Sequence, residues 1–443
     1  MQPRAIALLP MLLFLTLFIG SGLYYQYQNV EFAFYQISAP VAILPAIVLA
    51  LILGRGALNK RIETFIEGVG DHTIITMCLI YLLAGAFASV AKAVGGVDAT
   101  VNFGLSVIPD SLVLPGLFVI TAFVATSMGT SMGTIAAIAP VAVGLSEATD
   151  LSLALTVGTV IGGAMFGDNL SIISDTTIAA TRSQGCDMKD KFRLNLVIAL
   201  PAAIATLILL FVLGSSGQIS QPGDYDLLRV LPYVAVLVLA VSGLNVMLVL
   251  FTGIVLAGIV GLMQVPDYSI AQLSQDIYAG YTGMQEILIL SLLIGGLGAL
   301  MRQQGGLEFL ARSIDRLTRG SSERRSGETS IAASVALTNL CTANNTVAII
   351  ISGSLARDIA SRHGVDPRRS ASLLDIFSCV IQGMLPYGAQ MLLAGSIAAL
   401  SPLELIGTTY YCWLLGVIAI LAIITGIPKL QPKAVASAAT ANL

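Results

Sequence analysis

Apolar runs long enough to cross a lipid bilayer recur along almost the whole of this 443-residue chain. A transmembrane helix needs about 20 predominantly apolar residues to span roughly 30 Å of hydrocarbon. Charged residues make up only 11% of the chain, against about 25% in a soluble domain. The sequence therefore predicts an all-α polytopic membrane protein with about ten transmembrane helices, near residues 5–24, 38–54, 73–95, 151–181, 193–214, 229–241, 245–263, 284–301, 371–400 and 404–427.

Two further apolar segments, 112–148 and 329–357, are too long for one helix and carry Gly, Ser, Thr and Asn near their middle. We expect each to enter and leave the membrane on the same side, as a re-entrant hairpin. Non-helical backbone at membrane depth is tolerated only where it is buried in protein or lines a wet cavity. The tips of both hairpins are therefore expected inside the protein.

Basic residues separate the two sides of the membrane, because cytoplasmic loops are enriched in Lys and Arg. With ten spans and two hairpins, one side receives Arg4, Arg55, Lys60, Arg61, Arg182, Lys189, Lys191, Arg193, Arg357, Arg362, Arg368, Arg369, the arginines of 302–325, Lys429 and Lys433. The opposite loops, 25–37, 96–111, 215–228 and 264–283, contain no Lys or Arg. We therefore expect a multi-pass protein of the cell membrane with both termini in the cytoplasm, surrounded by lipid and without nucleic acid as a partner.

The order of these segments predicts two inverted-topology repeats. Each half has five crossings with a hairpin before the fourth, and an odd number of crossings inverts the second copy. The first repeat is 1–214, with its hairpin at 112–148 and a broken helix at 151–181; the second is 229–427, with its hairpin at 329–357 and a broken helix at 371–400; a cytoplasmic tail follows at 428–443. In the hairpins, 130–138 matches 342–350 weakly, with Thr130 opposite Thr342.

The fourth predicted span contains two carboxylates, Asp168 and Asp175. An aspartate at the centre of a membrane helix costs about 2.5–3.5 kcal/mol, which a bound cation or a proton can offset. A break after the first aspartate would let Asn169 and Ser171 face the same cavity, and hard cations prefer such oxygen ligands. We therefore predict that Asp168 and Asp175 bind the ion, with capping of half-helices by both aspartates as the alternative.

The tips of both predicted hairpins are rich in hydroxyl and amide side chains. The candidate residues there are Thr130, Thr134, Asn339, Thr342, Asn344, Asn345 and Thr346. Each tip is expected to start a half-helix whose N-terminus points into the protein, where it favours an anion or a carboxylate. Close helix packing through small residues is the alternative, but it does not explain two adjacent asparagines.

The ninth predicted span carries Asp375 and Gln390 on either side of a break at Pro386. Both are candidate ligands in the counterpart of the first broken helix. Asp375 lies six residues beyond Arg369, so an interfacial position paired with the arginine cluster that ends at Arg369 is an equal alternative.

The run Gly-Asp-Asn-Leu-Ser-x-x-Ser-Asp-Thr-Thr at 167–177 resembles the signature of the NhaC-type sodium/proton antiporter family, within a wider ion-transporter superfamily of inverted repeats with paired hairpins. Asn-Asn-Thr at 344–346 and Pro-Tyr-Gly at 386–388 also resemble that family. The resemblance implies sodium-coupled secondary transport, with an ion path lined by Asp168, Ser171, Ser174, Asp175 and Thr176. The commoner family pattern has a lysine and a proline where this chain has Asn169 and Ile172, and the missing lysine removes a potential counter-charge.

The leading hypothesis is a sodium/proton antiporter that works by alternating access, in which Na⁺ and H⁺ compete for the same carboxylates. The alternative is a sodium-coupled transporter of an amino acid or a small carboxylate. A remote alternative is an intramembrane hydrolase with paired aspartates, although both aspartates lie on one segment, and we expect no enzyme activity. No cofactor is expected besides the transported Na⁺ and H⁺, and a homodimer stays open.

Overall fold

The computed structural model of the chain describes residues 4–28, 30, 36–172, 174–214, 223–318 and 324–428. Within those ranges the backbone forms helices and no β-strand, which confirms the predicted all-α class. Of the predicted tail, 428–443, all but Pro428 lies outside the described residues.

The first half of the chain forms η1 (Ala5–Leu8), α1 (Leu9–Tyr27), α2 (Ala39–Ala42), α3 (Leu44–Leu53), α4 (Leu58–Val69), α5 (His72–Ala93), α6 (Gly96–Val107), η3 (Asp110–Leu112), α7 (Val113–Met128), α8 (Ser131–Glu147), α9 (Leu153–Leu170), α10 (Asp175–Gln184) and α11 (Met188–Gly214). The second half forms α12 (Leu227–Val241), α13 (Val246–Gln264), α14 (Ile270–Gly283), α15 (Gln285–Gln303), α16 (Gly306–Thr318), α17 (Arg324–Thr342), α18 (Asn345–His363), α19 (Pro367–Gln382), α20 (Ala389–Ala398), α21 (Pro402–Ile406) and α22 (Tyr410–Thr425).

The predicted apolar segments all fall on helices. Six helical stretches of the described chain are long and apolar enough to cross a membrane, and shorter apolar helices accompany them. Each predicted hairpin is a pair of helices, α7 with α8 and α17 with α18, and each predicted broken helix is also a pair, α9 with α10 and α19 with α20. Helices α4, α6, α14 and α16 occupy segments that the sequence suggested were loops. These four are short and amphipathic, so a search for apolar runs does not detect them.

Side chains at the internal breaks determine where the half-helices begin. Thr130, Ser174 and Asn344 precede α8, α10 and α18, and each side chain accepts a hydrogen bond from a backbone N–H of the first turn. Such capping satisfies a donor that has no partner within the helix. Gly129 ends α7 with φ of 69°, a left-handed conformation that glycine adopts without steric cost. Both hairpins can therefore turn inside the protein.

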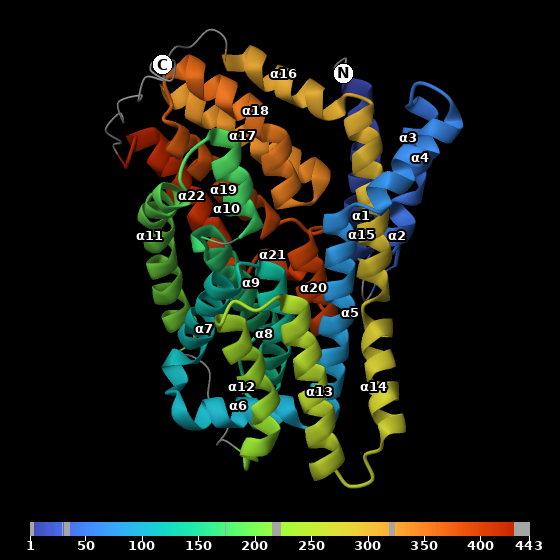
Figure 1. The fold of residues 1–443 in the computed structure, drawn as a ribbon, viewed down its shortest axis with the longest axis vertical. Helices are drawn as coiled ribbons and strands as arrows, with labels where there is room; N and C mark the ends of the chain where they lie inside the picture. Colours follow the sequence, from blue (N-terminus) through green and yellow to red (C-terminus); the bar gives the residue numbers. More distant parts are fainter. Residues whose placement is uncertain are drawn as a thin grey trace, which may run out of the picture.

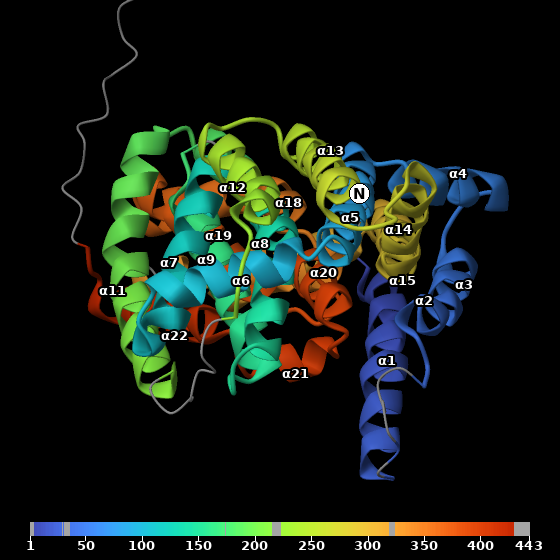
Figure 2. The same ribbon diagram turned by 90° about the horizontal axis from the view of Figure 1, so that it is seen from below.

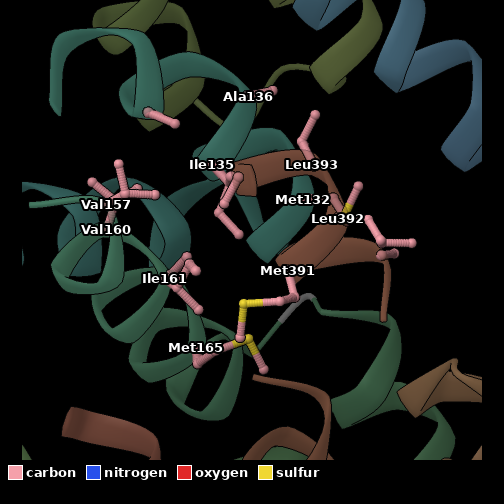
Figure 3. Close-up of a cluster of buried hydrophobic side chains, with 14 of the residues drawn as sticks. Met132, Ile135, Ala136, Val157, Val160, Ile161, Met165, Met391, Leu392 and Leu393 are labelled. Carbon is pink, nitrogen blue, oxygen red and sulfur yellow. The ribbon is translucent and has the colours of Figure 1, made fainter. Parts of the chain in front are cut away.

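The hairpins and broken helices occupy the middle of the molecule. In Figure 1, α7 and α8 lie in the lower half and α17 and α18 in the upper half. Helices α1 to α4 lie on one side of this centre and α11 and α22 on the other, as Figures 1 and 2 agree. Side chains of α8, α9 and α20 meet in a buried cluster that includes Ile135, Ile161 and Met391 (Figure 3). The two halves of the chain therefore share one core.

Two close helix crossings at glycines join the first half of the chain to the second. Helix α4 packs on α15, and a Cβ atom built on Gly68 would lie 2.6 Å from the carbonyl oxygen of Gly295. Helix α5 packs on α14, and a Cβ atom built on Gly280 would lie 2.3 Å from the carbonyl oxygen of Gly85. Glycine lets backbones approach this closely in membrane proteins, so the same kind of contact fixes α4 and α5 of the first half against α15 and α14 of the second.

Candidate functional site

A cavity of about 310 Å³ lies where the hairpin tips meet the breaks of the two interrupted helices. Its wall includes the predicted residues Thr130, Asp168, Asp175, Thr176, Asn344, Asn345, Thr346 and Gln390. It also includes side chains that the sequence did not single out as ligands, among them His72, Ser131, Asn245 and Gln382. The other predicted residues lie outside the wall: Thr134, Asn169, Ser171, Ser174, Asn339, Thr342 and Asp375.

Asp168 lies in the last turn of α9 and is 5% exposed. Its Oδ2 accepts hydrogen bonds from Ser131 Oγ at 3.0 Å and from Asn345 Nδ2 at 3.4 Å. Ser131 is the first residue of α8 and Asn345 is the first residue of α18, so both hairpins contact one carboxylate oxygen. Gln390 of α20 donates to Ser131 Oγ at 3.0 Å. A single polar network therefore joins α8, α9, α18 and α20.

The two hairpins have the same backbone geometry at their tips. Thr130 has φ −147° and ψ 121°, and Asn344 has φ −145° and ψ 115°. The residue opposite Thr130 is therefore Asn344, and not Thr342 as the sequence match predicts. The sequence match is shifted by two residues because it pairs Thr130 with Thr342, whereas the backbone pairs the two helix N-caps, Thr130 and Asn344.

Hydroxyl groups satisfy the backbone where α9 ends and α10 begins. Ser174 Oγ accepts from the Thr177 backbone N–H at 3.2 Å, and Thr177 Oγ1 donates to the Ser171 carbonyl at 2.7 Å. The cap of α10 is therefore Ser174 and not an aspartate. Asp175 follows as the first residue of α10 and is exposed at the cavity wall, with Thr176 buried beside it.

The remaining predicted hairpin residues hold the backbone of the hairpins. Thr134 Oγ1 donates to the Thr130 carbonyl at 2.9 Å, and Thr342 Oγ1 donates to the Asn344 carbonyl at 3.2 Å. Asn339 Nδ2 donates to the Ser378 carbonyl at 2.8 Å, which ties α17 to α19. These side chains shape the tips without lining the cavity.

Behind the cavity, Asp375 forms a fully buried ion pair. Its Oδ2 lies 2.7 Å from Lys191 Nζ, and neither side chain is exposed. Lys191 was expected in a cytoplasmic loop, but α11 begins at Met188, so Lys191 lies in its first turn and points to the break after α9. Arg369, the alternative partner of Asp375, instead pairs with Glu328 at 3.0 Å. The interfacial interpretation of Asp375 is therefore wrong.

Asn169 and Asn195 connect this ion pair to the broken helix. The Asn169 carbonyl accepts from Lys191 Nζ at 2.8 Å and from Asn195 Nδ2 at 3.0 Å, and Asn195 Nδ2 also donates to Asp375 Oδ2 at 2.7 Å. Among the described residues, the buried Oδ1 atoms of Asn169, Asn195 and Asp375 have no hydrogen-bond partner. The ion pair is thus surrounded by buried polar groups of α9, α11 and α19.

The electrostatics of the cavity favour a cation at the carboxylates. Asp168 and Asp175 belong to the wall, whereas no Lys or Arg does in the part of the chain that the structure describes. No group of three or more His, Cys, Asp or Glu side chains gathers among the described residues, so a cation would also need hydroxyl and amide oxygens.

The first residues of α8, α10, α18 and α20 all belong to the wall. Helix N-termini carry partial positive charge, which suits an anionic group.

Sequence reasoning missed Ser131, Lys191 and Asn195. Ser131 directly follows the residue that caps α8, a position that points into a hairpin tip. Lys191 and Asn195 are four residues apart and so share one face of α11, and both are completely buried. Two polar residues at this spacing at the start of an apolar helix were the available signal.

Interrupted helices and hairpin tips that converge on buried carboxylates are the architecture of secondary transporters. The sequence profile described as "Na+/H+ antiporter family" matches residues 5–215 and 227–427. This chain therefore belongs to the Na⁺/H⁺ antiporter family, and it is a multi-pass membrane transporter of Na⁺ and H⁺.

Individual relatives agree with this family. The chain is 26% identical over 399 residues to the Na⁺/H⁺ antiporter NhaC of Bacillus subtilis, covering 82% of this chain and 86% of the relative. It is 24% identical over 432 residues to the malate-2H⁺/Na⁺-lactate antiporter of the same organism, covering 89% and 90%. Among solved structures it resembles the YdaH transporter of Alcanivorax borkumensis, with 13% identity, 95% and 99% coverage and a TM-score of 0.45.

Proposed function

We propose that this chain exchanges Na⁺ for H⁺ across the cell membrane and that Asp168 is the carboxylate for which the two ions compete. The contact of both hairpin tips with Asp168 Oδ2 carries the proposal, because a cation or a proton at that atom changes the bonds of both hairpins. Ser131 can turn its hydroxyl so that its oxygen faces a cation.

The oxygen atoms around Asp168 suit Na⁺. Asp175, Thr176 and Asn345 belong to the same wall as Asp168, and carboxylate, hydroxyl and amide oxygens are the ligands of hard cations. We place Na⁺ between Asp168 and Asp175, and a proton on Asp168 when the ion has left. Lys191 and Asp375, behind the wall, hold the broken helix in place.

Two inverted repeats, 1–214 and 229–427, would provide the alternating access. The glycine crossings of α4 with α15 and of α5 with α14, and the matched caps of α8 and α18, support this division. We infer cytoplasmic termini, because the basic helices α4, α16 and α18 lie toward the end of the molecule that contains Arg4, away from α6 (Figure 1). His72 begins α5 and Asn245 precedes α13, and both line the cavity. The predicted order of spans directs the starts of both helices toward the cytoplasm, so we infer an inward-facing state.

The substitution Asp168→Asn tests the proposal, because the amide keeps the shape of the carboxylate but cannot bind Na⁺ and H⁺ in exchange. In proteoliposomes we expect it to abolish proton flux driven by a Na⁺ gradient. Asp150→Asn, which neutralises an exposed aspartate between α8 and α9, is the matched control and should keep the flux. Full Na⁺-dependent flux in Asp168→Asn would refute the assignment.

A second candidate is the coupled transport of a small carboxylate. The N-termini of α8, α10, α18 and α20 around the cavity favour it, since half-helix N-termini bind anionic substrate groups in transporters. The volume of about 310 Å³ is enough for a small organic acid, and one relative is named for malate and lactate. Uptake of radiolabelled malate or lactate that depends on a Na⁺ gradient would support this function. Na⁺-dependent proton flux without any uptake would exclude it.

A further inference from the structure

A second cavity, separate from the ion site, is lined by arginines. It has a volume of about 440 Å³ and lies among the ends of α10, α17, α18 and α19. Among the described residues, Arg324, Arg357 and Arg369 line it, together with a single carboxylate, Asp366. Asp366 is already paired with Arg368, whose Nη2 lies 2.7 Å from its Oδ2. The wall therefore carries an excess of positive charge.

The guanidinium groups of this cavity are only partly satisfied. Arg324 Nε and Arg369 Nη2 both contact Glu328, at 2.7 and 3.0 Å, so two arginines share one carboxylate. Within the ranges that the structure describes, the buried atoms Arg324 Nη2 and Arg369 Nη1 have no hydrogen-bond partner. Arg369 is only 1% exposed. A buried charged donor without an acceptor is costly, so these two atoms require a ligand.

We propose that this cavity binds a phosphate-type oxyanion. Guanidinium groups bind phosphate oxygens in parallel pairs of hydrogen bonds, and Arg324 and Arg369 each offer a free donor. Arg357, which is held in the cavity by its hydrogen bond from Nε to the Ser183 carbonyl at 2.8 Å, adds a third positive charge. The phosphate comes either from a free anion, since guanidinium groups recognise phosphate, or from an anionic lipid headgroup, since basic pockets between membrane helices bind such headgroups.

The bound anion would join helices that also form the ion site. Helix α18 places Asn345 on Asp168 and Arg357 in the basic cavity, about 18 Å apart at 1.5 Å per residue. Helices α10 and α19 line both cavities as well, and α17, which lines the basic cavity, packs on α18 and α19. The oxyanion therefore stabilises the packing of these four helices at their end remote from the ion.

Binding to the purified full-length protein tests the proposal without any transport assay. Inorganic phosphate is titrated at constant ionic strength against chloride, and the protein is separately placed in nanodiscs of phosphatidylcholine with and without phosphatidylglycerol. Thermal unfolding is followed in both series. We expect phosphate, phosphatidylglycerol or both to raise the unfolding midpoint. Protection by phosphate assigns a free anion, and protection by phosphatidylglycerol alone assigns the headgroup.

Variants locate the binding in the cavity. Arg357→Gln and Arg324→Gln should each weaken binding about tenfold, because each removes a charge-assisted interaction. Arg312→Gln on α16 is the matched control, since Arg312 is exposed and pairs with Glu308 at 3.3 Å outside the cavity. Arg369 is left unchanged because its loss would leave Glu328 poorly paired. If neither probe protects the protein, or if both cavity variants bind as well as Arg312→Gln, the proposal is overturned.

Discussion

The substitution Lys191→Met should destabilise the protein strongly. Lys191 Nζ lies 2.7 Å from Asp375 Oδ2, 2.8 Å from the Asn169 carbonyl and 2.7 Å from Thr177 Oγ1, so all three of its protons have acceptors. Neither charge is exposed, and methionine leaves the Asp375 carboxylate with neutral donors, Asn195 and Thr176. Removing one partner of such a pair costs about 3–5 kcal/mol. The double variant Lys191→Met/Asp375→Asn removes both charges and should recover about half of this loss.

The free energy of unfolding can be measured in mixed micelles through the fluorescence of Trp413, the single tryptophan of the chain. Lys92→Met is the control, because Lys92 lies 3.3 Å from Glu147 but both side chains are more than half exposed, at 67% and 56%. An exposed pair contributes about 0–1 kcal/mol. If Lys191→Met costs no more than Lys92→Met, or if the double variant is as unstable as the sum of both single variants, the buried pair does not have the predicted role.

Two further measurements address the ion site and the basic end of the molecule. Ser131→Ala should raise the Na⁺ concentration for half-maximal proton flux roughly tenfold, since it removes a hydrogen bond to a charged group. Ser127 is the control, because its Oγ donates to the Phe123 carbonyl outside the cavity, and Ser127→Ala should leave that concentration unchanged. Equal effects of the two variants would contradict the role of Ser131. Burial raises the pKa of the Cys186 thiol, between α10 and α11, to about 11. In a variant with Cys186 as its single cysteine, the alkylation rate should therefore rise about tenfold per pH unit up to that value. A plateau of the rate near pH 9 would refute the raised pKa.

The hairpins and broken helices could be predicted because their sequence signals are local. Polar residues and glycines interrupt otherwise apolar segments, and the structure has Thr130, Ser174 and Asn344 as helix caps at those interruptions. The amphipathic helices α4, α6, α14 and α16 were missed, because the search considered only apolar runs of membrane length. Their alternating polar and apolar faces carry a helical period that such a search averages away.

Contacts between distant parts of the chain could not be predicted. Lys191 looks like one of several basic residues beside a span, and only its contact with Asp375, 184 residues further along, distinguishes it from its neighbours. In the same way, the contact of Ser131 with Asp168 depends on how α8 packs against α9. The residue types of a site follow from local pattern, but which of them meet follows from packing.

The contact of both hairpins with one oxygen of Asp168 has a consequence for leakage. A cation that binds this atom changes its hydrogen bonds to Ser131 and to Asn345 together. By thermodynamic linkage, any hairpin movement that depends on those bonds alters the affinity for the cation by the same factor. If Asp168 binds the ion as proposed, both hairpin tips would therefore respond to the same binding event. An antiporter built in this way suppresses uncoupled ion slip without a separate sensor.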